Sequence, residues 1–137
     1  MRQEELKVIM KDEYEALSQL LALMDKQYTL IMKKDVFGLD KIIEEIKKCN
    51  KNVAEAEVER RKLSQGKAMK DIINASSDEE LDNLYRNIVK ILEEITLQKD
   101  TNELLIKQSL SYTNKMLSYI NPNRNTVTYD SYGKFKR

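Results

Sequence analysis

Glycine and proline are nearly absent from this chain, with 3 glycines and 1 proline among 137 residues. These residue types most often form turns and end helices, so the chain has few positions at which it can change direction. Few turns in a chain of this length mean long secondary-structure elements. Charged residues make up 34% of the chain, and lysine, glutamate, leucine and isoleucine are abundant, as in long helices with solvated outer faces. The sequence therefore predicts an all-α fold.

Length, charge and hydropathy narrow the class of protein. A chain of 137 residues suits one domain, which we place at residues 1–121, followed by a flexible tail at residues 122–137. The net charge of +1 comes from acidic and basic residues mixed along the chain, which argues against nucleic acid as a partner. No apolar run approaches the ~20 residues of a membrane-spanning helix, and the N-terminus lacks the apolar segment of a signal peptide. We therefore expect a cytoplasmic protein without membrane insertion.

The side-chain chemistry argues against an enzyme. The chain contains no histidine, which is the usual acid and base near neutral pH and the commonest metal ligand. Its one cysteine, Cys49, lies at helical spacing between Ile46 and Val53 and is expected to pack in the core. The charged cluster at residues 57–61 is expected to form solvated ion pairs. We therefore predict no catalytic residues, no cofactor and no metal site.

Apolar periodicity predicts two long helices that form an antiparallel hairpin. Apolar residues recur mostly every three, four or seven positions from residue 2 to about 34, and again from Leu39 to Leu63. Between them, Asp35 is a good N-cap and Gly38 tolerates the backbone dihedrals of a tight connection. The second stripe is heptad-like, which suits packing at a shallow crossing angle. It also suits a dimeric coiled coil, so the oligomeric state stays open.

A second change of direction is predicted at residues 64–66, where Gly66 favours the end of a helix. Residues 67–75 are expected to form a short helix. Ser77 then reads as an N-cap with Glu80 as the reciprocal partner of a capping box. The last helix should run from about Asp78 to Ile120, before Asn121 and Pro122. The predicted core consists of Leu17, Leu21, Met24, Ile42, Ile46, Leu84, Ile88 and Leu92.

Two features of the last helix are unusual. Gln98 and Asn102 interrupt its apolar stripe, either because they fix the register of the helix or because they face solvent. Farther on, the helix is apolar on two sides, with Leu105, Tyr112 and Met116 on one stripe and a second stripe beside it. The second stripe consists of Ile106, Leu110, Leu117 and Ile120. It is explained either by a partner protein or by coverage from the short helix or a second copy.

The tail is polar and without apolar periodicity, and it carries three aromatic residues at intervals of three, Tyr129, Tyr132 and Phe135. Aromatic residues in a mobile segment can anchor a partner, although an inert tail explains the same sequence.

Together these elements resemble the FlgN family of flagellar export chaperones over nearly the whole chain. The resemblance lies in a leucine-rich first helix and in the ordered motifs Asp35-x-x-x-Leu39, Glu57 to Leu63, Asn102-x-x-Leu105-Ile106-x-x-Ser109-Leu110, and Tyr129-x-x-x-Gly133. It implies a helical chaperone that holds hook-filament junction proteins and delivers them to the export gate of the flagellar type III apparatus. It places cargo binding at Asn102, Leu105, Ile106, Ser109, Leu110, Thr113, Leu117 and Ile120. Docking on the export gate is placed at Tyr129, Tyr132 and Gly133, with either tyrosine able to fill the role.

The competing interpretation is a structural coiled-coil adaptor that acts mainly by self-association. It explains the heptads equally well. It does not explain the apolar C-terminal half of the last helix or the aromatic residues of the tail.

Overall fold

The computed structural model describes residues 2–120, 128–129 and 135–136. Four helices account for nearly all of these residues: α1 (Arg2–Lys33), α2 (Val36–Ser64), α3 (Met69–Ser76) and α4 (Glu79–Ile120). The prediction of an all-α chain with a long hairpin and a short extra helix is confirmed. Within the described ranges, no helix combines the length and the apolarity that a membrane crossing would require.

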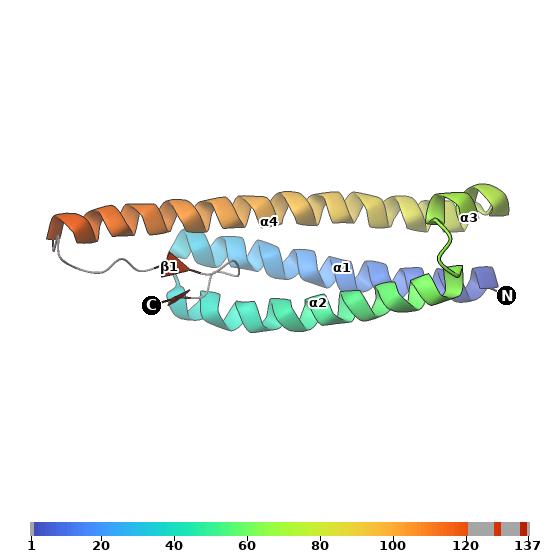
Figure 1. Cartoon of the computed structure of the whole chain (residues 1–137), viewed down its shortest axis with the longest axis horizontal. Coiled ribbons are helices and arrows are strands. Elements are labelled where there is room, and N and C mark those ends of the chain that lie inside the picture. The colour runs from blue at the N-terminus through green and yellow to red at the C-terminus, as the bar shows by residue number, and fades with distance from the viewer. Residues whose placement is uncertain (1, 121–127, 130–134, 137) are drawn as a thin grey trace.

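The three long helices lie side by side, with α1 in the middle (Figure 1). Helix α2 returns antiparallel to α1, and α3 redirects the chain so that α4 runs antiparallel to α2 and therefore parallel to α1. Polar contacts agree with this direction, because Lys7 near the start of α1 binds Asp78 before α4, while Gln27 farther along α1 binds Asn102. Helix α1 packs along both neighbours, whereas α2 and α4 share no comparable interface in the described part of the chain.

The core follows the heptad-like stripes of the three long helices. Of the predicted core residues, Leu17, Met24, Ile42, Ile46 and Ile88 are buried, and Leu21 and Leu84 are half-buried against them. Leu92 was predicted wrongly, since its side chain is 45% exposed. Because α4 packs extensively on one helix only, its buried face is narrow, and Leu92 lies outside it. Cys49 is buried as predicted, and burial raises the pKa of its thiol.

The α1–α2 connection is tighter than the sequence predicted. Asp35 caps α2 as expected, with Oδ1 accepting a hydrogen bond from the Gly38 amide at 2.9 Å. However, α2 already begins at Val36, and the left-handed backbone lies at Lys34, with φ of 57°, instead of Gly38. A Cβ atom at Gly38 would lie 2.8 Å from Leu30 Cδ2 and 2.7 Å from Asp35 Oδ2. Gly38 therefore serves close packing rather than an unusual dihedral angle.

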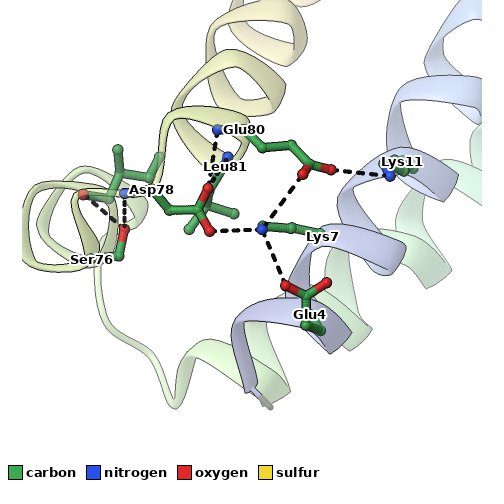
Figure 2. Close-up of polar contacts among 8 residues, drawn as sticks. Glu4, Lys7, Lys11, Ser76, Asp78, Glu80 and Leu81 are labelled. Atoms are coloured by element: carbon green, nitrogen blue, oxygen red, sulfur yellow. Dashed lines mark hydrogen bonds and ion pairs between the residues drawn. The ribbon is translucent and has the colours of Figure 1, made fainter.

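The second change of direction also differs in one detail. Gln65 and Gly66 both adopt positive φ and end α2, as the prediction for residues 64–66 requires. Ser77, predicted as the N-cap of the last helix, instead ends α3 in the left-handed conformation, with φ of 54°. Asp78 caps α4, because its Oδ1 accepts hydrogen bonds from the amides of Glu80 and Leu81 (Figure 2). The N-cap of the last helix was therefore predicted one residue too early, and the predicted capping box of Ser77 and Glu80 was wrong.

Four residues of the tail are described. They form the short strands β1 (Thr128–Tyr129) and β2 (Phe135–Lys136), which pair antiparallel with Thr128 opposite Lys136 and Tyr129 opposite Phe135. The prediction of a flexible segment at residues 122–137 falls mostly outside the described residues.

Candidate interaction surface

Helix α4 extends beyond the hairpin that supports it. Asn102 contacts α1 at Met24 and Gln27, and α1 ends at Lys33, six residues after Gln27. Six to nine residues after Asn102, α4 is therefore level with the end of α1, yet it continues to Ile120. Figure 1 shows this C-terminal part of α4 projecting past the α1–α2 connection. We call residues 110–120 the overhang; at the helical rise they span ~15 Å.

The overhang stays helical because its own sequence supports a helix. Residues 79–120 contain no glycine or proline, and Thr113 donates its hydroxyl to the carbonyl of Ser109 within the helix. What changes along α4 is burial. Leu81, Ile88, Ile91 and Ile95 are buried, whereas no residue after Asn102 is fully buried among those whose side chains are described. The C-terminal part of the predicted stripe, Leu110, Leu117 and Ile120, thus lies at or beyond the level at which α1 ends, whereas Ile106 still lies alongside α1.

The structure brings most of the predicted cargo residues to this one region of α4. Leu105, Ile106, Leu110 and Leu117 are half-buried, and Ser109, Thr113 and Ile120 are exposed. Ile106, Leu110 and Leu117 follow one another at intervals of four and seven residues, so they share one face of the helix. Asn114 lies on the same face, and its Oδ1 is shielded from solvent without a hydrogen-bond partner among the described residues. Among the described residues, this face is therefore mainly apolar and contains a shielded acceptor that makes no hydrogen bond.

Asn102 differs from the other predicted cargo residues because the fold uses its side chain. It is 1% exposed, and its Nδ2 donates to the Met24 carbonyl at 2.8 Å and to Gln27 Oε1 at 3.0 Å. Its Oδ1 accepts from Gln98 Nε2 at 2.9 Å. Of the two explanations that the sequence left open, the structure supports a role in the bundle rather than exposure to solvent. In this arrangement Asn102 cannot contact a partner.

Sequence reasoning missed an apolar patch on the hairpin beside the overhang. Phe37 is 89% exposed in the first turn of α2, and Met32, Val36 and Tyr28 are exposed near it in the chain. The signal for Phe37 was its position two residues after the N-cap Asp35, in the connection between the two helices of the hairpin. Large apolar side chains therefore gather on both α4 and the hairpin at this end.

At the opposite end of the bundle, next to α3, ion pairs connect α1 to the start of α4. Lys7 is 8% exposed, and its Nζ lies 2.7 Å from Asp78 Oδ2 and 3.2 Å from Glu4 Oε1 (Figure 2). Glu80 bridges Lys7 and Lys11, at 3.6 Å and 3.3 Å. The hydrogen bond with Lys7 lowers the pKa of Asp78, and the same bond raises the pKa of Lys7. These groups satisfy one another, which argues for a structural role at this end.

The two arginines of the charged cluster at residues 57–61 of α2 form different kinds of ion pair. Arg61 and Glu57 form the exposed ion pair that the sequence predicted. Arg60 instead reaches into the α1–α2 interface, where its Nε lies 3.0 Å from Oε1 of the buried Glu13. Burial raises the pKa of Glu13, and the neighbouring Arg60 opposes that rise. The prediction of a solvated pair was therefore wrong for Arg60.

The predicted gate-docking residues are the least described. Tyr129 belongs to β1, and nothing is described of its side chain, while Tyr132 and Gly133 lie outside the described residues. The side chain of Tyr112, predicted on the first apolar stripe, is likewise outside them.

One comparison with known proteins gives a match. The model of a family described as FlgN protein matches residues 1–137, the whole chain. No curated protein and no solved structure matches it.

Proposed function

The chain belongs to the FlgN family of non-enzymatic flagellar export chaperones, and from this premise we propose that it holds hook-filament junction proteins in the cytoplasm and delivers them to the export gate. The observation that carries the proposal is the overhang, an apolar helical end that extends past its supporting hairpin. A chaperone needs such a surface, because its cargo must be held without becoming part of the permanent fold.

The geometry favours a helical segment as cargo. An amphipathic helix binds a groove or face through side chains spaced by three, four and seven residues, and Ile106, Leu110 and Leu117 have that spacing. The overhang continues the direction in which α4 packs on α1, so a cargo helix can lie where α1 would be if α1 were longer. Phe37, at the α1–α2 connection, would then contact the end of that helix. A donor on the cargo would satisfy Asn114 Oδ1.

The charged residues of α4 indicate which kind of cargo helix would be favoured. Glu103 is the last acidic residue of α4, and from Leu104 to Ile120 the only charged residues are Lys107 and Lys115. A cargo helix with acidic residues beside its apolar face would therefore be favoured, chiefly in its rate of association.

For delivery, we place docking on the export gate in the tail, at Tyr129 or Tyr132 with Gly133. The tail follows the overhang directly in the chain, so a loaded chaperone would present both together. An aromatic anchor in such a segment can supply much of the binding energy of a short motif.

The test is copurification of cargo from a flagellated host with a triple variant, Ile106→Ser, Leu110→Ser and Leu117→Ser. We expect cargo binding to be lost while the melting temperature changes little, because none of these side chains is fully buried. The matched control is Leu97→Ser with Leu104→Ser, since these exposed leucines also lie on α4 but outside the predicted stripe. Retained cargo in the triple variant, or equal loss in the control, would contradict the proposal.

A second candidate function is self-association as a coiled-coil adaptor. One observation favours it: Leu97 and Leu104 are 70% and 56% exposed and lie one heptad apart on α4, where a second copy could pack. Sedimentation equilibrium separates the two functions. A mass equal to one chain at all concentrations would exclude the adaptor, and a dimer lost in the Leu97→Ser, Leu104→Ser variant would support it.

A further inference from the structure

The buried stripe of α1 contains two uncharacteristic residues. Apart from Lys7, the buried positions along α1 alternate at intervals of four and three residues, as in a heptad repeat. Six of the eight side chains are apolar, and the other two are Glu13 and Gln27. The full stripe is Leu6, Met10, Glu13, Leu17, Leu20, Met24, Gln27 and Ile31.

Each of these two polar residues binds a different neighbouring helix. Glu13 accepts a hydrogen bond from Arg60 of α2 at 3.0 Å. Gln27 accepts one from Asn102 of α4 at 3.0 Å. Arg60 and Asn102 are themselves polar members of heptad-like stripes, so each interface of α1 contains a matched polar pair within its stripe, in addition to the ion pairs of Lys7 and Lys11 with Glu80 at the start of α4.

Such a pair distinguishes one register from the next. An apolar heptad seam packs nearly as well after a slip of seven residues, because leucine and isoleucine recur at the same positions. If α4 slipped by one heptad towards its C-terminus, Ile95 would replace Asn102 beside Gln27. The buried amide of Gln27 would then lose its partner, which is costly, whereas the apolar contacts would largely be kept.

We propose that Gln27 and Asn102, supported by Gln98, form a register pair that sets how far α4 projects beyond the α1–α2 connection. Asn102 is well placed for this, since it is the last fully buried residue of α4 among the described side chains. The pair fixes the position of α4 along α1 and does not itself contact cargo. That it thereby positions the cargo-binding overhang rests on the proposed function; the register itself does not.

The experiment measures the register directly in the full chain. Spin labels are placed on the exposed positions Lys26→Cys of α1 and Lys115→Cys of α4, with Cys49→Ala removing the native thiol. Because the labels lie at different levels along the bundle, a slip of α4 changes their separation. Asp78→Asn is added to weaken the ion pair with Lys7 at the other end, and asparagine still caps a helix well.

With the register pair intact, we expect a single narrow distance by pulsed electron paramagnetic resonance. Replacing both residues, Gln27→Leu with Asn102→Leu, should add a second population displaced by up to ~10 Å, the length of one heptad. Should the leucines prevent folding, Gln27→Ala with Asn102→Ala removes the amides without adding bulk and should give the same second population.

Two controls make the result specific. Glu13→Leu with Arg60→Leu removes the other polar pair and should leave the distance between α1 and α4 single. Exchange of the amides, Gln27→Asn with Asn102→Gln, should also keep one population. A single unchanged distance in both the leucine and alanine double variants would overturn the proposal, and so would splitting in the Glu13 and Arg60 control. Cargo is absent from this measurement, so failure of the proposed cargo role would not affect its outcome.

Discussion

The two ends of the bundle differ in how α4 is held against the α1–α2 hairpin. At the α3 end, the start of α4 is held against α1 by the ion pair of Lys7 with Asp78, and Asp78 also caps the helix. At the other end, α4 projects past the α1–α2 connection (Figure 1), with Ile120 75% exposed on α4 and Phe37 89% exposed in the first turn of α2. Polar groups are satisfied at the first end, and apolar groups are left without full cover at the second.

This difference follows from helix length. Helix α1 has 32 residues and α4 has 42, and the two start close together. All of the excess length must therefore appear at one end. An exposed apolar surface can therefore arise when one helix of a heptad-like pair is simply longer than its partner, with no special motif.

The largest expected effect is on the free energy of unfolding, which should fall more for a substitution near the α3 end than for one in the overhang. Ile88→Ala removes a buried side chain near the α3 end and should lower the free energy of unfolding by ~2 to 5 kcal/mol. Leu117→Ala, in the overhang, should cost less than about 1 kcal/mol because its side chain is only half-buried. Urea denaturation followed by circular dichroism measures both. Equal losses would show that the overhang belongs to the core.

The next effect concerns the tail that follows the overhang. Tyr129→Ala should weaken docking on the export gate by ~2 kcal/mol if it is the aromatic anchor, and should leave cargo affinity unchanged. Binding of the loaded chaperone to the isolated gate domain would be titrated calorimetrically. Tyr132→Ala decides which tyrosine acts. If both single variants and a truncation after Asn123 bind normally, the tail has no role in docking.

A smaller effect is expected at the hairpin patch. Phe37→Ser should reduce cargo affinity by ~1 kcal/mol or somewhat more, because an exposed aromatic ring at the edge of a binding surface is only partly desolvated by the partner. Folding should be unaffected. Val8→Ser is the control, since Val8 is exposed at the α3 end of α1. A change in affinity for Val8→Ser but not for Phe37→Ser would reverse our assignment of the two ends.

The smallest expected effect is a pH dependence of the stability that the Lys7–Asp78 contact contributes at the α3 end. The pKa of Asp78 is lowered by Lys7, so below its ordinary value of 3.8 the unfolded chain binds a proton that the folded chain does not. Stability from this contact is therefore complete above that pH and is lost as the pH falls through the lowered pKa. In Asp78→Asn, the acid-induced fall of the melting temperature should be shallower. An identical acid profile would mean that the contact with Lys7 contributes nothing measurable.

Several parts of the fold were predictable from local chemistry. The Asp35 cap, the end of α2 near Gly66 and the end of α4 before Pro122 each depend on a few adjacent residues. The predicted core was right on α1, which has a helix on each side, as at Leu17 and Met24, and at the centre of the α2 stripe, as at Ile42. It failed at Leu92, because periodicity shows which residues share a face but not how wide the covered part of that face is.

The sequence by itself determined that the chain forms long helices, where those helices begin and end to within a few residues, and which side chains share most of each stripe, because these depend on interactions between residues close in the chain. Only the tertiary structure decided that α1 lies between α2 and α4, that α4 runs parallel to α1, and that α4 projects at one end. It also decided that Asn102 is buried against Gln27 and that Phe37 is exposed. These outcomes depend on which residues meet across the bundle, and a heptad repeat offers many nearly equivalent pairings among which local sequence cannot choose.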